Sequence, residues 1–319
     1  LKSTVAGELA YDDMMKRAGE GKTGSISTGE LNETVMDEDS EVTSDKALYT
    51  TNYKKYEITE KMSSEQIISN LRKFMNEAKS QNAIPHAVNS LEYFLSGKGG
   101  RLDVDKNWYR SFEGVRQAEE RNINRFFYVS RSDNFITALE KGYKGTPLNI
   151  IEKINKKYKG FEKMKIGETI EFNDYWKTKV NILDPNKKEN QDFFFTFGAT
   201  ILKTSAKVIA KKVTNDDISI TITEVKYTIV DKYDWETTLI SRKGVKLNPK
   251  ELEKFTGVKG VSINFQDKAM QKLVNEGKGK TFDYNLTYSG QDRTKTINFR
   301  RDVINRYWKL GGAWRGIGF

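Results

Sequence analysis

The sequence predicts an α+β protein, with an N-terminal helical subdomain followed by a mainly antiparallel β-sheet subdomain with short helices. Between residues 61 and 160, apolar residues recur every three or four positions, the period of an amphipathic helix. After Gly160, apolar and polar residues alternate, as in a strand with one buried face. We therefore expect an acidic, loosely ordered leader or linker over 1–60, a helical subdomain over 61–160, and a β-rich subdomain with a basic aromatic tail over 161–319.

The leader is predicted from its composition. Residues 19–45 are rich in Gly, Ser, Thr, Glu and Asp and hold few large apolar side chains, too few to offset the entropy lost on ordering. Residues 1–60 carry 7 Lys and Arg against 13 Asp and Glu, a net charge of −6. The chain begins with leucine, so we expect a fragment or a module released from a larger secreted protein.

Helices are predicted by start and stop signals around periodic apolar stripes. Ser63 and Gln66 have capping-box spacing at the start of a first helix. Pro85 suits the first turn of a second helix, and Gly97 suits its end. Further helices are expected at about 112–128, 133–142, 147–160, 249–255 and 265–274.

Strands are predicted by alternation between turn signals. They are expected at about 169–172, 175–183, 193–201, 206–213, 218–223, 281–288 and 294–299. Residues 214–217 favour a hairpin turn, and the last two strands are expected to form another hairpin. The apolar phase slips after Ile222, which predicts a β-bulge at Thr223 and Glu224.

The best candidate for chemistry is the strand that starts at Val225 and runs into Asp231, Tyr233 and Asp234. A strand end holds polar groups rigidly while leaving them open to solvent. Asp231 and Asp234 are three residues apart, close enough to share a proton or a cation if the chain turns there. The alternative is a strand that leaves the core with its tyrosine packed and its acids solvated.

Composition restricts the chemistry. The chain has no cysteine and one histidine, His86, so disulfides, thiolate metal sites and multi-histidine metal sites are excluded. No apolar run approaches the roughly 18 residues of a membrane helix. The net charge is +10, and residues 61–319 carry +16. A segment with this positive charge can bind nucleic acid, an anionic membrane surface or an acidic protein. A lysine-rich surface that binds no ligand would have the same composition.

Several motifs resemble known toxins. A helix ending in "FLSGKGG", a β block, "VDKYDW", "FTGVKG" and "LVNEGKGKTFDYNLTY" together resemble C-terminal modules of bacterial polymorphic toxins over about residues 85–300. Asp231-x-Tyr233-Asp234 resembles the D-x-Y-D element of colicin M-like bacteriocins, which cleave the undecaprenyl-pyrophosphate linkage of lipid II with a metal, usually Mg²⁺. The family element continues to a His-Arg pair, where this chain has Ser241 and Arg242.

The resemblance implies a catalytic set of Asp231, Tyr233, Asp234 and Arg242. Asp231 and Asp234 would hold Mg²⁺ through carboxylate oxygens. Tyr233 would orient a phosphate, and Arg242 would balance its charge. The metal would polarise a phosphoryl oxygen and supply an activated water.

We therefore expect an antibacterial effector that hydrolyses a phosphoester or pyrophosphate in a lipid-linked envelope precursor. It would be secreted or delivered into the envelope or cytoplasm of a target cell, and an acidic immunity protein would be its partner. One alternative is a non-enzymatic module that perturbs membranes or serves as a binding or structural part of a secretion machine. A second alternative, prompted by the positive charge, is a nuclease toxin.

Overall fold

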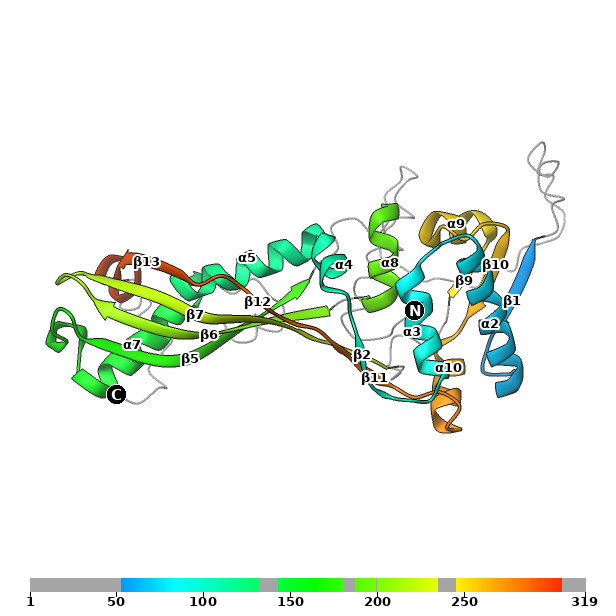
Figure 1. Cartoon of the computed structure of the whole chain (residues 1–319), viewed down its shortest axis with the longest axis horizontal. Helices are drawn as coiled ribbons and strands as arrows, with labels where there is room; N and C mark the ends of the chain where they lie inside the picture. The colour runs from blue at the N-terminus through cyan, green and yellow to red at the C-terminus, as the bar shows by residue number, and fades with distance from the viewer. Residues whose placement is uncertain (1–52, 132–142, 181–186, 199, 235–244, 306–319) are drawn as a thin grey trace, which may run out of the picture. The chain divides into compact units, whose positions relative to one another are not determined.

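The structure is a computed structural model that describes residues 53–131, 143–180, 187–198, 200–234 and 245–305 (Figure 1). The chain is an α+β protein with mainly antiparallel sheets, as predicted. The expected helix at 133–142 and nearly all of the expected leader lie outside the described residues. Within the described part of the chain, no helix has the length and apolar character needed to cross a membrane.

Contacts divide the chain into two compact units. Unit 1 comprises Leu1–Leu102, Asp184–Ala199 and Lys232–Asp283, and unit 2 comprises Asp103–Leu183, Thr200–Asp231 and Tyr284–Phe319. This grouping differs from the contiguous segments suggested by the sequence, because strands that are distant along the chain pair with one another. The first example is in unit 1, where β1 (Lys54–Ile58) pairs in parallel with β10 (Val261–Phe265).

Unit 1 contains two small sheets and several helices. One sheet has the order β1-β10-β9, and the other has the order β2-β11-β8. The remaining strands are β2 (Gly100–Asp103), β8 (Lys232–Tyr233), β9 (Val245–Leu247) and β11 (Phe282–Asn285). The chain passes into unit 2 within β2, at Asp103, and within β11, at Tyr284. The helices are α2 (Ser64–Ser80), α3 (Pro85–Leu95), α8 (Lys188–Phe197), α9 (Pro249–Thr256) and α10 (Asp267–Asn275).

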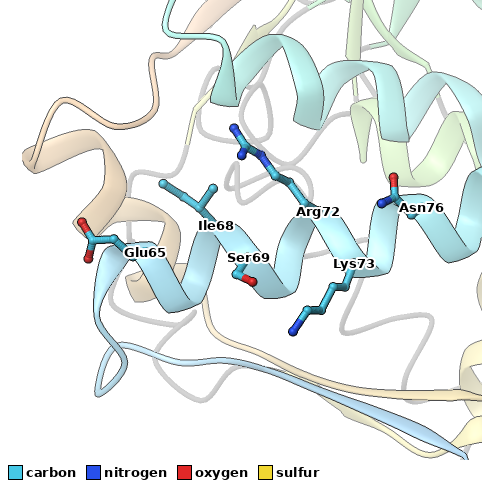
Figure 2. Close-up of a pocket in the computed structure, with 6 residues that line it drawn as sticks. All are labelled: Glu65, Ile68, Ser69, Arg72, Lys73 and Asn76. Carbon is cyan, nitrogen blue, oxygen red and sulfur yellow. The ribbon is translucent and has the colours of Figure 1, made fainter.

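The capping signals in unit 1 are confirmed. At the start of α2, the Gln66 N–H donates to Ser63 Oγ at 3.2 Å, and the Ser63 N–H donates to Gln66 Oε1 at 2.9 Å. The inner face of α2 buries Ile67 and Leu71 completely. Its outer face carries a shallow surface groove lined by Glu65, Ile68, Ser69, Arg72, Lys73 and Asn76 (Figure 2). Because all of these residues come from one helix, the groove is an open depression.

The predicted strand at 193–201 is wrong over most of its length, because the chain forms helix α8 there and begins the next strand only at Thr200. A strand buried on one face would leave every second side chain outside, yet Phe193, Phe194 and Phe195 are all buried. Phe193 and Phe197, one helical turn apart, have ring centroids 4.9 Å apart. The second half of α8 is buried on every side, and its run of apolar residues includes an alternating set.

Unit 2 is built on one antiparallel sheet with the order β12-β7-β6-β5, and β13 also pairs with β7. Its strands are β5 (Thr169–Val180), β6 (Thr200–Lys212), β7 (Asp217–Val230), β12 (Thr287–Ser289) and β13 (Arg293–Asn298), with a small pair β3 (Ser130–Arg131) and β4 (Tyr143–Lys144). The helices are α4 (Lys106–Ser111), α5 (Glu113–Phe127) and α7 (Thr146–Tyr158), with short turns η2 (Phe161–Lys163) and η3 (Arg300–Ile304). Helices α5 and α7 run along the sheet (Figure 1).

The predicted bulge in β7 is confirmed. Ser205 pairs with Lys226 and Lys207 pairs with Thr223, so β7 carries one residue more than β6 across this step. Glu224 lies in the bulge with φ of 54°, in the left-handed region. A bulge increases the local twist of its strand, and this one precedes the end of β7 at Val230 and the following Asp231.

The predicted C-terminal hairpin is wrong. β12 and β13 do not pair with each other; both pair with β7, one after the other along its length. The intervening Gly290 lies opposite the bulge, and its N–H donates to the Val225 carbonyl at 2.8 Å. A Cβ at Gly290 would lie 2.7 Å from Val225 Cγ1, so only glycine fits this close approach.

Candidate functional site

Strand β7 ends at the first predicted carboxylate. Val225, Tyr227 and Ile229 are buried along one face of the strand, and Asp231 follows them with a partly exposed side chain. The Asp231 backbone is anchored, because its carbonyl accepts a hydrogen bond from the Tyr284 N–H at 3.0 Å. Unit 2 therefore holds Asp231 at a fixed strand end, where the residue is partly exposed and its Oδ2 atom is buried.

Tyr233 is an anchor within unit 1. Its side chain is 1% exposed, and its ring stacks on Phe282 with centroids 4.8 Å apart and planes 11° apart. The Phe94 ring lies 6.0 Å away. Burial raises the pKa of the Tyr233 phenol, so this group stays protonated at neutral pH. The ring fixes the segment by packing, and the phosphate-orienting role of Tyr233 stays a prediction.

Asp234 follows this anchor, and its side chain is partly exposed. Arg242 lies outside the described residues. The described part of the chain holds no group of three or more His, Cys, Asp or Glu side chains arranged to bind a metal. Mg²⁺ is commonly bound through one or two carboxylates together with water and substrate phosphates, so the residue types of Asp231 and Asp234 fit this ion. The Mg²⁺ site stays a prediction.

A buried tyrosine in unit 2 responds to the charge of Asp231. Tyr109, on α4, is completely buried. Burial raises the pKa of its phenol, and the negative charges of Asp231 and Glu119 raise it further. Tyr109 therefore stays protonated and lies within electrostatic range of both carboxylates.

Unit 2 also contains a cluster of polar side chains that the sequence did not reveal. It is formed by Arg110, Glu119, Tyr227 and Tyr288 and is called the Glu119 cluster below. Tyr288 Oη donates to Glu119 Oε1 at 2.6 Å. Arg110 donates to both carboxylate oxygens of Glu119, from Nε at 2.8 Å and from Nη2 at 3.1 Å. Glu119 is only 8% exposed, yet each of its oxygens accepts a hydrogen bond.

The tyrosines of the Glu119 cluster are strongly perturbed. The rings of Tyr227 and Tyr288 stack with centroids 5.1 Å apart. Burial, followed by the charge of Glu119, raises the pKa of Tyr227 to about 12. Burial and the hydrogen bond to Glu119 raise the pKa of Tyr288. A signal for this cluster was present in the sequence, since Glu119 falls within the apolar stripe of α5 beside Val115 and Ala118.

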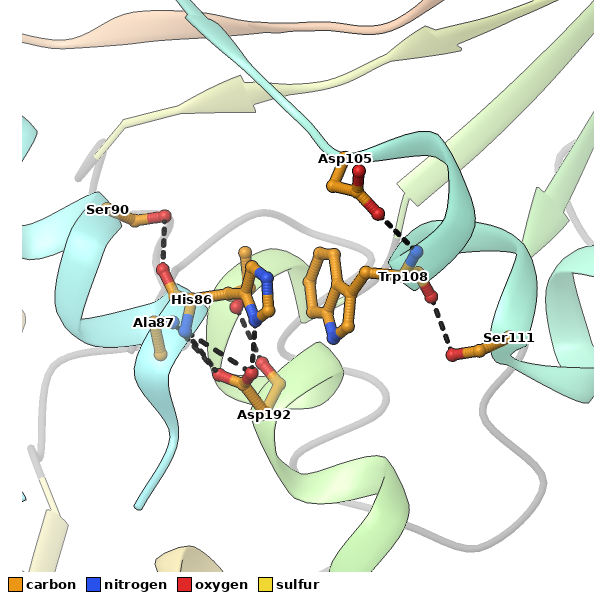
Figure 3. A network of polar contacts seen from close by, with 8 residues as sticks. His86, Ala87, Ser90, Asp105, Trp108, Ser111 and Asp192 are labelled. Carbon is orange, nitrogen blue, oxygen red and sulfur yellow. Dashed lines mark hydrogen bonds and ion pairs between the residues drawn. The ribbon is translucent and has the colours of Figure 1, made fainter. Parts of the chain in front are cut away.

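Unit 1 holds a second arrangement that the sequence did not reveal, in which Asp192 on α8 receives the first turn of α3 (Figure 3). Asp192 Oδ1 accepts hydrogen bonds from the backbone N–H groups of His86 and Ala87, both at 3.0 Å. The His86 imidazole Nδ1 lies 2.6 Å from Asp192 Oδ2. Ile84, the residue before α3, provides no side-chain cap, so Asp192 satisfies these N–H groups instead.

The histidine of this pair is accessible. The side chain of His86 is 37% exposed and that of Asp192 is 15% exposed. A carboxylate that binds Nδ1 orients an imidazole and favours the tautomer with its other nitrogen as the acceptor, which is the arrangement of a general base. No spacing in the sequence links these two residues, which are 106 positions apart.

Comparison with protein-family models, curated proteins and solved structures finds no match to this chain.

Proposed function

We propose that this chain is a hydrolase module of an antibacterial effector, which cleaves a phosphoester or pyrophosphate bond in a lipid-linked envelope precursor. The observation that carries the proposal is the end of β7. There, a long strand of unit 2 leads into Asp231, and Asp234 follows the buried Tyr233 at the start of the next segment of unit 1. The packing of Tyr233 restricts the position of Asp234, which follows it in unit 1.

The residues would act in separate roles. Asp231 and Asp234 would supply the oxygen ligands for a divalent cation, and Tyr233, whose packing holds the adjacent Asp234, would orient the phosphate. Arg242 would neutralise phosphate charge. In the reaction, a water oxygen attacks phosphorus, the bond from phosphorus to the leaving oxygen breaks, and the water proton passes to solvent or to the leaving oxygen. Bound Mg²⁺ would supply Lewis-acid activation of the phosphoryl group.

The proposed setting follows from the resemblance and from charge. A toxin that acts on envelope precursors must be secreted or delivered into the target cell, and its producer needs an immunity protein. With a net charge of +10, the toxin would bind an acidic immunity partner most readily.

The decisive experiment expresses the chain in a bacterium with and without an export signal, beside Asp231→Asn and Asp234→Asn variants. Lysis only on export, relieved by either variant, supports an envelope substrate and this site. Purified protein should release phosphate from an undecaprenyl-pyrophosphate-linked substrate only with Mg²⁺. Losing one carboxylate ligand should lower the rate by at least about 100-fold, comparable to removal of other charged catalytic groups.

The matched control is Asp292→Asn, which removes an exposed carboxylate of unit 2 that plays no part in the proposal. Its toxicity should equal that of the unmodified chain. All three variants should keep the same urea midpoint, so that a loss of activity is not a loss of fold. Full toxicity of a stably folded Asp234→Asn protein would contradict the hydrolase proposal.

A second candidate is a non-enzymatic binding module. A specific observation favours it: the sheet of unit 2 leaves one face open, and lysines are spread over that face. A third candidate, a nuclease, predicts DNA or RNA degradation with Mg²⁺ and binding that weakens steeply with salt.

A further inference from the structure

The sheet of unit 2 has one covered face and one open face. Asn122 on α5 donates to the Leu202 carbonyl at 2.9 Å and to Thr204 Oγ1 at 3.0 Å, and Thr178 Oγ1 donates to Asn122 at 2.5 Å. The even-numbered residues of β5 and β6 therefore face the helices. The odd-numbered residues point to the other side, and all of those on β6 are partly or fully exposed.

Two aliphatic side chains lie exposed on the open face at the end of the sheet nearest Asp231. Ile201 on β6 pairs directly with Val230 on β7, and they are 39% and 40% exposed. Val230 immediately precedes Asp231 in the chain. Exposed side chains of this type are unremarkable singly, but cross-strand partners on one face form a continuous apolar area.

Lysines and a tyrosine border this aliphatic pair. Lys203 follows Ile201 on this face of β6, and Lys177 on β5 lies directly opposite Lys203. Tyr175 follows Lys177 on the same face of β5 and is 55% exposed. The ammonium groups of Lys177 and Lys203 lie 6.0 and 4.8 Å from the centroid of the Tyr175 ring. These residues, with Ile201 and Val230, are called the open-face patch below.

The open-face patch breaks a rule of sheet stability. Like charges placed directly across two strands repel one another, and here the face of Tyr175 is their compensating contact. On this face, none of the residues paired in the registers of Ile201, Lys203 and Ser205, all of which the structure describes, is acidic. Lys207, one register further, forms an ion pair with Glu171 on the same face, with Nζ 3.1 Å from Oε2. The excess of lysines over carboxylates beside Ile201 and Val230 is complementary to an anionic partner.

The chemistry of the patch selects among anionic partners. Nucleic acid would use the lysines and Tyr175 but gains little from Ile201 and Val230. A bilayer surface uses all of them: aliphatic side chains enter the acyl boundary, tyrosine sits at headgroup level, and lysines extend to the phosphates. Each lysine near an anionic membrane contributes about 1 kcal/mol.

We propose that the open-face patch docks this protein on an anionic phospholipid surface. Docking brings the end of β7, and with it Asp231, to the membrane. The inference is independent of catalysis, because it concerns binding of the folded chain to lipid and holds whether or not the hydrolase proposal is correct.

The test is flotation of the full chain with vesicles of phosphatidylcholine, with and without phosphatidylglycerol. The unmodified chain should bind only the anionic vesicles and should dissociate at high salt. Lys177→Gln with Lys203→Gln should weaken binding by about 25-fold, at about fivefold for each lysine. Ile201→Ser with Val230→Ser should weaken binding and make the remainder more sensitive to salt, because its apolar part is lost.

The chain offers matched controls in the same unit. Ile166, 60% exposed, lies in the turn before β5, and Lys295 lies 4.1 Å from the centroid of the exposed Tyr128 ring. Lys295 pairs with the buried Ile220 and so belongs to the helix side of the sheet. Ile166→Ser and Lys295→Gln should bind vesicles as the unmodified chain does.

Unchanged vesicle binding by both patch variants would overturn the inference. So would an equal loss of binding in the Ile166→Ser and Lys295→Gln controls. A third contradicting result is tighter binding to single-stranded DNA or to polyglutamate than to anionic vesicles. The last result would assign the patch to a nucleic acid or to an acidic protein. If a double variant unfolds, the single variants Lys203→Gln and Val230→Ser apply the same test with smaller effects.

Discussion

Unit 1 and unit 2 each hold a carboxylate against a titratable side chain, but they do so at different depths. In unit 2, Glu119 is buried, and Arg110 and Tyr288 donate to its oxygens. In unit 1, Asp192 caps α3 and binds His86, whose side chain is 37% exposed. A buried carboxylate is stable only if its hydrogen bonds are made, whereas an exposed imidazole can exchange protons with solvent.

The buried arrangement and the exposed arrangement therefore have different roles. The Glu119 cluster should act mainly on stability and on the environment of Tyr109, which also responds to the charge of Asp231. The His86 pair should cost less to disrupt, because water replaces its lost contacts. Substitutions in the two units measure this difference directly.

The largest effect is expected for Glu119→Ala in unit 2. It removes the acceptor for Tyr288 and Arg110 and leaves a buried phenol in the interior, which should lower the free energy of unfolding by about 3 kcal/mol. Urea denaturation followed by circular dichroism measures the loss. The control is Glu120→Ala, the next residue of α5, which is exposed and should change stability by less than about 0.5 kcal/mol. Equal losses in the two variants would show that the cluster does not hold the unit together.

A smaller effect is expected for Asp192→Ala in unit 1. It removes a capping acceptor for two backbone N–H groups at the start of α3, worth about 1–2 kcal/mol. Asp192→Asn keeps a capping oxygen and should lose less than half as much. Asp283→Ala, an exposed position of the same unit, is the control. If Asp192→Ala destabilises more than Glu119→Ala, the contrast between the two units is wrong.

The two arrangements also show what the sequence can predict. The capping box at Ser63, the helix α5 and the bulge at Glu224 depend on neighbours along the chain, and all three were predicted. The strand expected at 193–201 was wrong because Phe193, Phe195 and Phe197 fit an alternating pattern, whereas Phe194 between them is also buried and the chain forms a helix. Tertiary contacts decide such short apolar runs.

The candidate site divides in the same way. The packing of Tyr233 follows from alternation, since it is in phase with the buried Val225, Tyr227 and Ile229, and Asp231 lies directly after the end of β7, as expected. Glu119 and Tyr288 are 169 residues apart, and His86 and Asp192 are 106 apart. No local pattern joins such pairs, since their meeting depends on how α5, α8 and the last strands pack.

Alkaline titration separates burial from charge in the Glu119 cluster. Tyrosine in an unfolded chain ionises at about pH 10, and the pKa of Tyr227 is raised to about 12. The neutral phenol is favoured in the folded state, so its contribution to stability is complete below pH 10 and is lost as the pH rises toward 12. Tyrosinate absorbance of Tyr227→Phe should lack a component near pH 12, and Glu119→Gln should shift that component downward.

The control for the titration is Tyr175→Phe, because Tyr175 is 55% exposed. It should not remove the component near pH 12. A Tyr227→Phe variant that instead loses a transition near pH 10 would show that neither burial nor Glu119 acts on this ring.

The smallest effect is expected where each unit strains its backbone with a residue other than glycine. Glu224 in the β7 bulge has φ of 54°, and Ile84 before α3 has φ of 41°. Glu224 is exposed, so Glu224→Gly should relieve strain without losing packing and should stabilise by about 0.5–1 kcal/mol, whereas Glu224→Ala should not. Urea midpoints measure both, and equal midpoints for the Gly and Ala variants would rule out stored strain.

Ile84 is 7% exposed, so glycine there would lose buried surface that outweighs the relief. Burial thus holds Ile84 in unit 1, and the pairing of β6, β7 and Gly290 around the bulge holds Glu224 in unit 2.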